Sequence, residues 1–69
     1  MSNVLLHLKA KNDVNGNPRR LFVLLENGEV RKVVNEGYRG IPEELRALPI
    51  IPINVTTSEF ESWKNWKVS

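Results

Sequence analysis

The sequence contains no cysteine, so neither a disulfide bond nor a reactive thiolate contributes to this protein. It also lacks a long hydrophobic run, because the apolar stretch near the N-terminus covers only Val4 to Leu6. A secretory signal peptide needs an apolar segment of about 7 to 15 residues, and a transmembrane helix needs about 20. From these absences we expect a cytoplasmic protein that does not enter a membrane.

Groups suited to catalysis are equally scarce. His7 is the only histidine, and strand alternation directs it outward with no acidic residue opposite, as is typical of a surface histidine. Glu43 and Glu44 are adjacent, so their carboxylates point in different directions and cannot flank one substrate atom. No glycine-rich segment has the spacing of a phosphate-binding loop. The sequence therefore predicts a protein that is not an enzyme and that holds no cofactor.

The chain length of 69 residues predicts a single small domain over residues 1–69. Such a short chain buries only a modest fraction of its surface, so we expect marginal stability. The net charge of +2 is distributed unevenly. Lysine and arginine are in excess in residues 1–39, whereas residues 40–69 are close to balanced.

Two Asn-Gly dipeptides, Asn15-Gly16 and Asn27-Gly28, each separate two apolar stretches. This dipeptide favours a two-residue type I′ hairpin turn, in which both central residues need a positive φ. With such turns, Leu8 lies opposite Val23. Both hairpins then place apolar residues beside the same face of the middle strand, the face that carries Leu21, Val23 and Leu25. A slip of one residue would reverse every side chain, so this agreement predicts a three-stranded antiparallel meander.

The segment "DVNGNPRR", residues 13–20, also has oxygen-bearing side chains at every second position from Asp13, as in a calcium-binding loop. An EF-hand loop requires glycine at its sixth position and glutamate at its twelfth, where this chain has Pro18 and Leu24. We therefore interpret the segment as a turn, without a metal ion. Pro18 either lies near the strand ends or forces a wider loop.

The second half of the chain carries weaker strand and helix signals. "PEELRAL", residues 42–48, predicts a short helix, because proline suits the first helical position and the glutamates suit the N-terminal end. Apolar β-branched residues predict a strand near residues 50–55, and Pro52 confines that strand to an edge or a bulge.

The clearest helix signal follows Thr56. A capping box pairs either Thr56 with Glu59 or Ser58 with Glu61. Three aromatic residues recur every three positions, at Phe60, Trp63 and Trp66. We interpret them as the core side of the helix rather than as a platform for stacking bases. The predicted fold class is α+β: a three-stranded antiparallel meander, a short helix, a fourth strand at the edge, and a C-terminal helix packed on the sheet.

The opposite face of the meander is the predicted interaction surface. In the expected register Lys9 lies opposite Phe22, and Lys11 lies opposite Arg20. Leu24 lies between His7 and Arg31. Basic side chains thus surround an exposed aromatic and aliphatic patch, unless the C-terminal helix covers this face. The candidate contact residues are Lys9, Lys11, Arg20, Phe22 and Arg31.

The glycine-flanked "EGYRG" segment adds Tyr38 and Arg39 as a second candidate contact, or as a loop whose tyrosine covers the core edge. The favoured partner of the basic face is an acidic protein surface, with Phe22 as the apolar anchor. Single-stranded nucleic acid is the alternative partner, with phosphates on the basic side chains and a base on the ring. A merely solvated face, or a subunit that dimerises through the strand at residues 50–55, are the remaining interpretations.

Overall fold

The computed structural model describes residues 3–11 and 13–65, with Arg31 described by its backbone only. It confirms the predicted α+β order of elements. The strands are β1 (Val4–Lys11), β2 (Pro18–Glu26), β3 (Glu29–Asn35) and β4 (Ile50–Asn54). The 3₁₀ turn η2 (Glu43–Leu45) lies where the short helix was expected, and a further 3₁₀ turn, η1 (Tyr38–Gly40), lies in the EGYRG segment. Helix α1 (Thr57–Lys64) follows β4.

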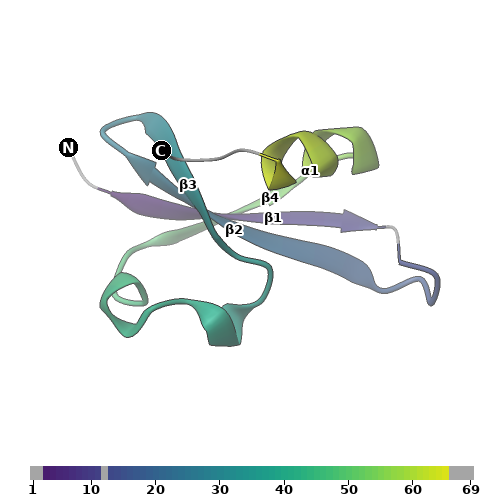
Figure 1. The fold of residues 1–69 in the computed structure, drawn as a ribbon, viewed down its shortest axis with the longest axis horizontal. Coiled ribbons are helices and arrows are strands. Elements are labelled where there is room, and N and C mark those ends of the chain that lie inside the picture. The colour runs from purple at the N-terminus through teal and green to yellow at the C-terminus, as the bar shows by residue number, and fades with distance from the viewer. Residues whose placement is uncertain (1–2, 12, 66–69) are drawn as a thin grey trace.

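The four strands form one sheet in the order β3-β2-β1-β4. Strands β1, β2 and β3 pair antiparallel, so the predicted meander is confirmed, and β4 joins the open side of β1 in a parallel direction. Figure 1 shows α1 on one side of the sheet and the two 3₁₀ turns on the other. We call these the helix side and the turn side.

The segment "DVNGNPRR" forms a turn that the Asp13 side chain organises. Its carboxylate Oδ1 accepts the backbone N–H of Asn15 at 2.9 Å and that of Asn17 at 2.7 Å. The Asp13 carbonyl accepts the N–H of Gly16, which has a φ of 82°. Asn15 does not share that positive φ, so this turn is not the predicted two-residue type I′ turn. The interpretation as a turn is confirmed, in the wider form.

The wider loop changes the pairing of β1 with β2. Leu8 lies opposite Leu21 rather than opposite Val23, and Pro18 closes the ladder opposite Lys11. The predicted register was therefore wrong by two residues. Because side chains alternate with a period of two, a displacement of two leaves each residue on its predicted side of the sheet.

The second hairpin has the predicted type I′ turn, with φ values of 55° at Asn27 and 83° at Gly28. Leu25 lies opposite Val30, as expected. Further along, Leu24 pairs with Lys32 and leaves Arg31 as an unpaired bulge residue, so the expected position of Arg31 beside Leu24 was wrong.

The bulge has a physical reason. In the regular register Lys32 falls on the helix side, where burying its ammonium group is costly. With the bulge, Lys32 is exposed opposite Leu24, and Val33 packs on the helix-side core instead. A second irregularity sets Phe22 opposite Asn35 and leaves Val34 to pack on the turn side.

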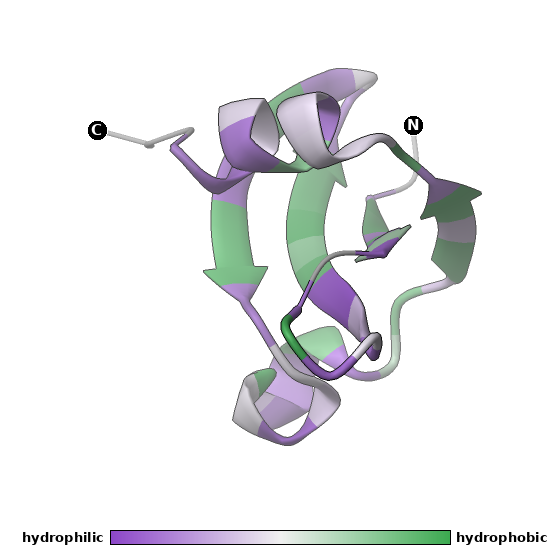
Figure 2. Ribbon diagram, turned by 90° about the vertical axis from the view of Figure 1, so that its right-hand side faces the viewer, coloured by the Kyte–Doolittle hydropathy of each residue, from purple (hydrophilic) through white to green (hydrophobic). Residues whose placement is uncertain are grey.

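Both sides of the sheet carry a core. Figure 2 shows hydrophobic residues along the strands between the two covering layers. On the helix side the buried residues are Leu6, Leu8, Ala10, Leu21, Val23 and Phe60. On the turn side they are Leu5, Phe22, Leu24 and Ile41, with Leu45 and Leu48 packed against them.

The buried turn side corrects the predicted surface. Phe22 has only 2% of its surface exposed and Leu24 has 9%, so the expected open aromatic patch was wrong. The connection from β3 to β4 carries Ile41, Leu45 and Leu48 at intervals of three and four residues. These side chains cover the strands because a chain of this size gains most by burying its large apolar groups.

Helix α1 begins with the predicted Thr56–Glu59 capping box. Thr56 Oγ1 accepts the N–H of Glu59 at 3.1 Å, and Glu59 Oε1 accepts the N–H of Thr56 at 3.0 Å. Phe60 is buried and Trp63 is partly buried against the helix-side core, which confirms their assignment to the core. Trp66 lies outside the described residues.

Strand β4 is an edge strand in which the backbone of Pro52 faces away from β1. The N–H of Leu5 bonds to the Pro49 carbonyl at 2.8 Å, and that of Val55 bonds to the Lys9 carbonyl at 2.9 Å. By alternation, odd-numbered residues of β4 face β1 and even-numbered residues face the open edge. Pro52, which has no N–H, therefore occupies an open-edge position, as predicted. In the described part of the chain, no helix has the length and apolar character needed to span a bilayer.

Candidate binding surface

Three basic residues meet at the end of the sheet beside the first hairpin turn. Lys9 on β1 lies directly opposite Arg20 on β2, and Lys11 follows two residues later on the same side, opposite Pro18. We call Lys9, Lys11 and Arg20 the basic cluster. Like charges directly opposite one another destabilise an antiparallel pair of strands, so the Lys9–Arg20 pair costs stability.

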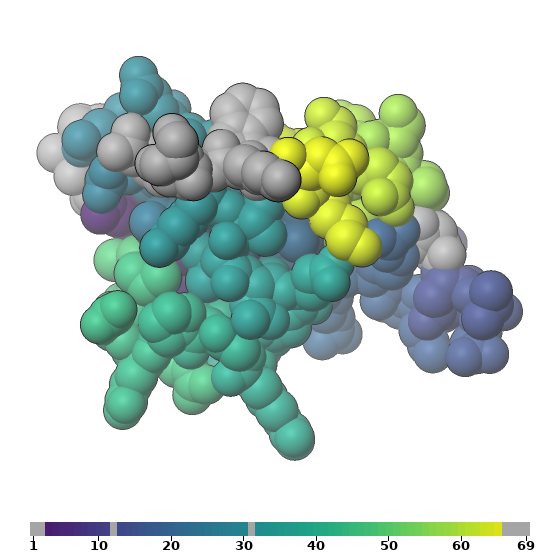
Figure 3. All heavy atoms as spheres, viewed as in Figure 1, coloured from purple at the N-terminus to yellow at the C-terminus, as the bar shows by residue number. Residues whose placement is uncertain are grey.

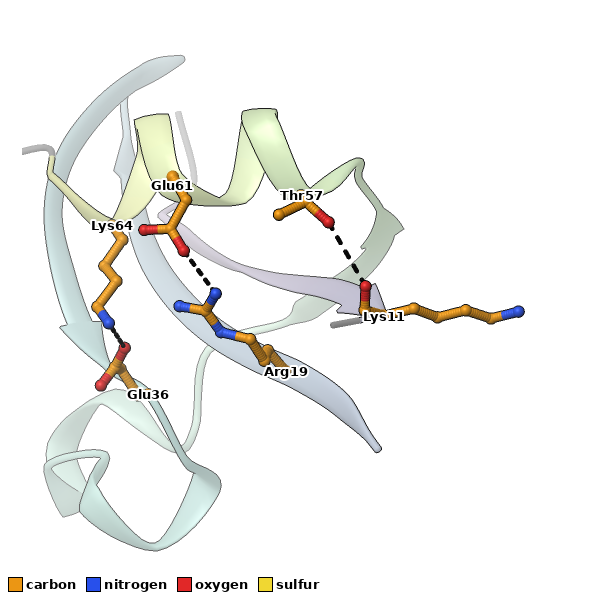
Figure 4. A network of polar contacts seen from close by, with 6 residues as sticks. All are labelled: Lys11, Arg19, Glu36, Thr57, Glu61 and Lys64. Carbon is orange, nitrogen blue, oxygen red and sulfur yellow. Dashed lines mark hydrogen bonds and ion pairs between the residues drawn. The ribbon is translucent and has the colours of Figure 1, made fainter. Parts of the chain in front are cut away.

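No carboxylate of the described residues forms an ion pair with the basic cluster. The two ion pairs in the described chain use other cations: Arg19 with Glu61, and Lys64 with Glu36 at 3.2 Å. Lys9, Lys11 and Arg20 form no ion pair with any residue that the structure describes. In Figure 4 the Lys11 side chain extends away from both ion pairs, while its carbonyl faces Thr57.

Arg19, next to Arg20 in the sequence, has a different role. Its guanidinium lies 4.2 Å from the centre of the Phe60 ring, on the helix side, and pairs with the Glu61 carboxylate. The hydrogen bond from Arg19 lowers the pKa of Glu61. Of these two adjacent arginines, Arg19 is therefore bound to α1, whereas Arg20 forms no ion pair with a described residue.

The basic cluster borders a buried aromatic stack. The His7 ring stacks on Phe22 with 4.5 Å between ring centres and 4° between ring planes. His7 lies on its predicted side of the sheet but is partly covered, which corrects its predicted exposure, and its Nε2 is buried without a hydrogen bond to the described residues. Burial, reinforced by the charges of Arg20 and Lys9, lowers the pKa of His7 from its ordinary value of 6.5.

The lowered pKa of His7 makes the stability of the protein depend on pH. The folded state binds fewer protons than the unfolded state, so the stabilisation is full above about pH 6.5 and is lost as the pH falls through the lowered pKa. We expect the urea midpoint to decrease between about pH 7.5 and about pH 5.5. The His7→Phe variant keeps the ring stack and should lose this decrease. An equal decrease in the variant would contradict the assignment.

Tyr38 and Arg39 lie on the turn that covers Phe22. The Tyr38 ring meets the Phe22 ring edge-on at 6.0 Å and keeps 51% of its surface exposed. Arg39 is also exposed. Phe22, which Tyr38 contacts, lies two residues from Arg20 on the same side of β2.

Arg46, which the sequence did not identify, holds this turn together. Its Nε donates to the Ile41 carbonyl at 3.1 Å, its Nη2 donates to the Arg39 carbonyl at 3.1 Å, and its guanidinium lies 5.4 Å from the Tyr38 ring centre. From the other side, Asn35 Oδ1 accepts the N–H of Gly37 at 3.0 Å. An arginine in a short helical segment carries no sequence signal that separates this role from simple exposure.

The structure thus places the predicted contact residues in different environments. Lys9, Lys11 and Arg20 are brought together, and Tyr38 contacts Phe22, which is two residues from Arg20 on β2. Phe22 is buried beneath Tyr38 and does not present its ring to a partner. The side chain of Arg31 lies outside the described structure.

A groove of about 530 Å³ adjoins the basic cluster. It lies between the first hairpin turn and the junction of β4 with α1. Figure 3 shows the hairpin turn, in blue, projecting beyond the rest of the molecule at this end. The residues that line the groove are Lys9, Ala10, Lys11, Gly16, Pro18, Asn54, Val55, Thr56 and Thr57.

Comparisons with protein families, with curated proteins and with solved structures found no match to this chain. Among the described residues, no three acidic, histidine or cysteine side chains gather in a way that could hold a metal ion. The candidate site therefore stands on its own geometry: a basic cluster, an exposed tyrosine and an adjoining groove.

Proposed function

We propose that this protein is a small non-enzymatic binding module that docks on an acidic protein surface through its basic cluster. The observation that carries the proposal is the Lys9–Arg20 pair, two like charges opposite each other with no carboxylate partner in the described chain. An arrangement that costs stability and remains uncompensated is typical of a site that a partner completes.

The chemistry of the surface supports this partner. Arginine and lysine give charge-assisted hydrogen bonds to carboxylates and steer an acidic partner during approach. Tyr38 supplies an exposed aromatic group with a polar tip, a side chain that is enriched at protein interfaces. Tyr38 thereby takes the anchoring role that the sequence had suggested for Phe22.

Single-stranded nucleic acid is the alternative partner of the same residues. Binding without sequence preference combines a basic path for phosphates with aromatic rings for successive bases. Here the predicted stacking ring, Phe22, is buried, and the net charge is only +2. Both observations favour the acidic protein partner.

The proposal is tested by NMR amide titration with poly-L-glutamate and, separately, with a mixed-sequence single-stranded DNA oligonucleotide. Poly-L-glutamate is expected to shift the amides of Lys9, Lys11 and Arg20. The double variant Lys9→Gln/Arg20→Gln should bind about tenfold more weakly, since each exposed ion pair contributes up to about 1 kcal/mol. Lys32→Gln, which removes an exposed lysine outside the cluster, is the matched control and should bind as the wild type does.

A stability measurement separates a binding role from a structural one. Removing the like-charge pair should raise the urea midpoint of Lys9→Gln/Arg20→Gln while it weakens binding. If the double variant binds poly-L-glutamate as tightly as the wild type, the basic cluster is not the site. If the oligonucleotide binds more tightly and its affinity falls steeply with salt, nucleic acid replaces the acidic protein as the partner.

A further inference from the structure

We infer that the groove beside the basic cluster takes an extended acidic segment of the partner, with acidic residues at alternate positions. This inference rests on the proposed function and specifies how the partner is recognised. The groove is open to solvent, and its volume of about 530 Å³ lies within the usual size range of ligand-binding clefts.

The lining of the groove is complementary to a negatively charged occupant. Among the described residues that line the groove, Lys9 and Lys11 are the charged ones, and none is an aspartate or glutamate. Asn54, Thr56 and Thr57 are its polar lining residues, and Ala10, Pro18 and Val55 are apolar lining residues. The nearest carboxylates in the sequence are those of Asp13 and Glu59. Asp13 Oδ1 accepts the backbone N–H groups of Asn15 and Asn17, and Glu59 is directed back to Thr56 by the capping box.

The spacing of the two lysines indicates an extended occupant. Lys9 and Lys11 are two residues apart on one strand, so they project from the same side and stand about 7 Å apart along it. In an extended peptide, side chains two residues apart have the same direction and the same spacing. Acidic residues at positions i and i+2 therefore match the two ammonium groups, whereas adjacent acidic residues point to opposite sides.

The open edge of β4 offers the peptide backbone hydrogen bonds, and Pro52 limits how far along β4 the peptide can pair. Asn54 is an even-numbered residue of β4, so its N–H and carbonyl face the open edge beside the groove. An extended peptide pairs with such groups as an added strand. Pro52, the preceding open-edge position, has no N–H, so pairing stops there and the peptide is confined to the groove end of β4.

The test compares two synthetic peptides of identical composition, acetyl-Ser-Glu-Ala-Glu-Ser-amide and acetyl-Ser-Glu-Glu-Ala-Ser-amide, by NMR amide titration of the full chain. The alternating peptide is expected to bind at least about threefold more tightly, because only it engages both lysines. It should shift the amides of Gly16 and of Asn54 to Thr57. In Lys11→Gln the two peptides should bind equally, since one of the matched charges is gone.

Arg20→Gln is the matched variant, because Arg20 belongs to the basic cluster and does not line the groove. It should weaken both peptides alike and leave the preference for alternation intact. Equal binding of the two peptides to the wild type, or shifts that avoid the groove, would overturn the inference. If poly-L-glutamate still depends on Lys9 and Arg20 in that case, the proposed function survives. If it does not, both fail.

Discussion

Replacing Phe22 with alanine is expected to reduce the free energy of unfolding by about 3–5 kcal/mol, enough to abolish most of the stability of a domain this small. The ring has 2% of its surface exposed, lies against His7 on one side, and meets Tyr38 edge-on at 6.0 Å. Truncation removes the ring and leaves a cavity that the surrounding strands cannot close.

Urea unfolding followed by tryptophan fluorescence measures this effect. Val14→Ala is the control, because Val14 is 99% exposed in the first hairpin turn and its truncation should change the midpoint little. The experiment also decides between the two positions considered for Phe22. A ring exposed on an open sheet face would cost less than about 1 kcal/mol when truncated, and such a result would contradict the buried turn side.

Replacing Phe60 with alanine should cost a similar amount, about 3–5 kcal/mol, and should also unfold α1. Phe60 is the only buried residue within Thr57–Lys64, so its ring attaches the helix to the sheet. Helices as short as α1 do not persist in water without tertiary packing. The guanidinium of Arg19, at 4.2 Å from the ring centre, also loses its stacking partner.

The loss of α1 is measured by the backbone chemical shifts of residues 57–64, together with the urea midpoint. Ser62→Ala, an exposed substitution on the same helix, is the control and should keep both values near those of the wild type. Retention of helical shifts in Phe60→Ala, with a loss below about 1 kcal/mol, would show that α1 is attached by other contacts.

The element order could be predicted from the sequence because local signals agreed with one another. Asn27-Gly28 formed the expected type I′ turn, and Thr56 with Glu59 formed the expected capping box. The strand registers were predicted less accurately than the element order. The first hairpin widened because the Asp13 carboxylate binds two backbone N–H groups, an option that competes with the type I′ turn.

The candidate site was predicted in part. Lys9 and Arg20 were placed on the correct side of the sheet, because a two-residue error in register preserves sidedness. The burial of Phe22 was not predicted. The residues on the turn side are spaced by three and four positions in the β3–β4 connection, and this spacing does not identify a segment that packs on a sheet. Ile41 and Leu45 belong to the turn-side cluster that contains Phe22, and they come from a connection that the sequence marks as a loop and a short helix.

The parallel pairing of β1 with β4 determines when the sheet can be completed during synthesis. Leu5 lies opposite Ile50, a separation of 50 − 5 = 45 positions, whereas both hairpins join near neighbours. Contacts between distant residues require a larger loss of chain entropy before they form. As the chain leaves the ribosome, the meander is complete once residue 35 has emerged, but one edge of β1 stays open until β4 follows. Because β1 is central in the finished sheet, its unpaired state is the interval in which the nascent chain is most exposed to wrong strand pairing.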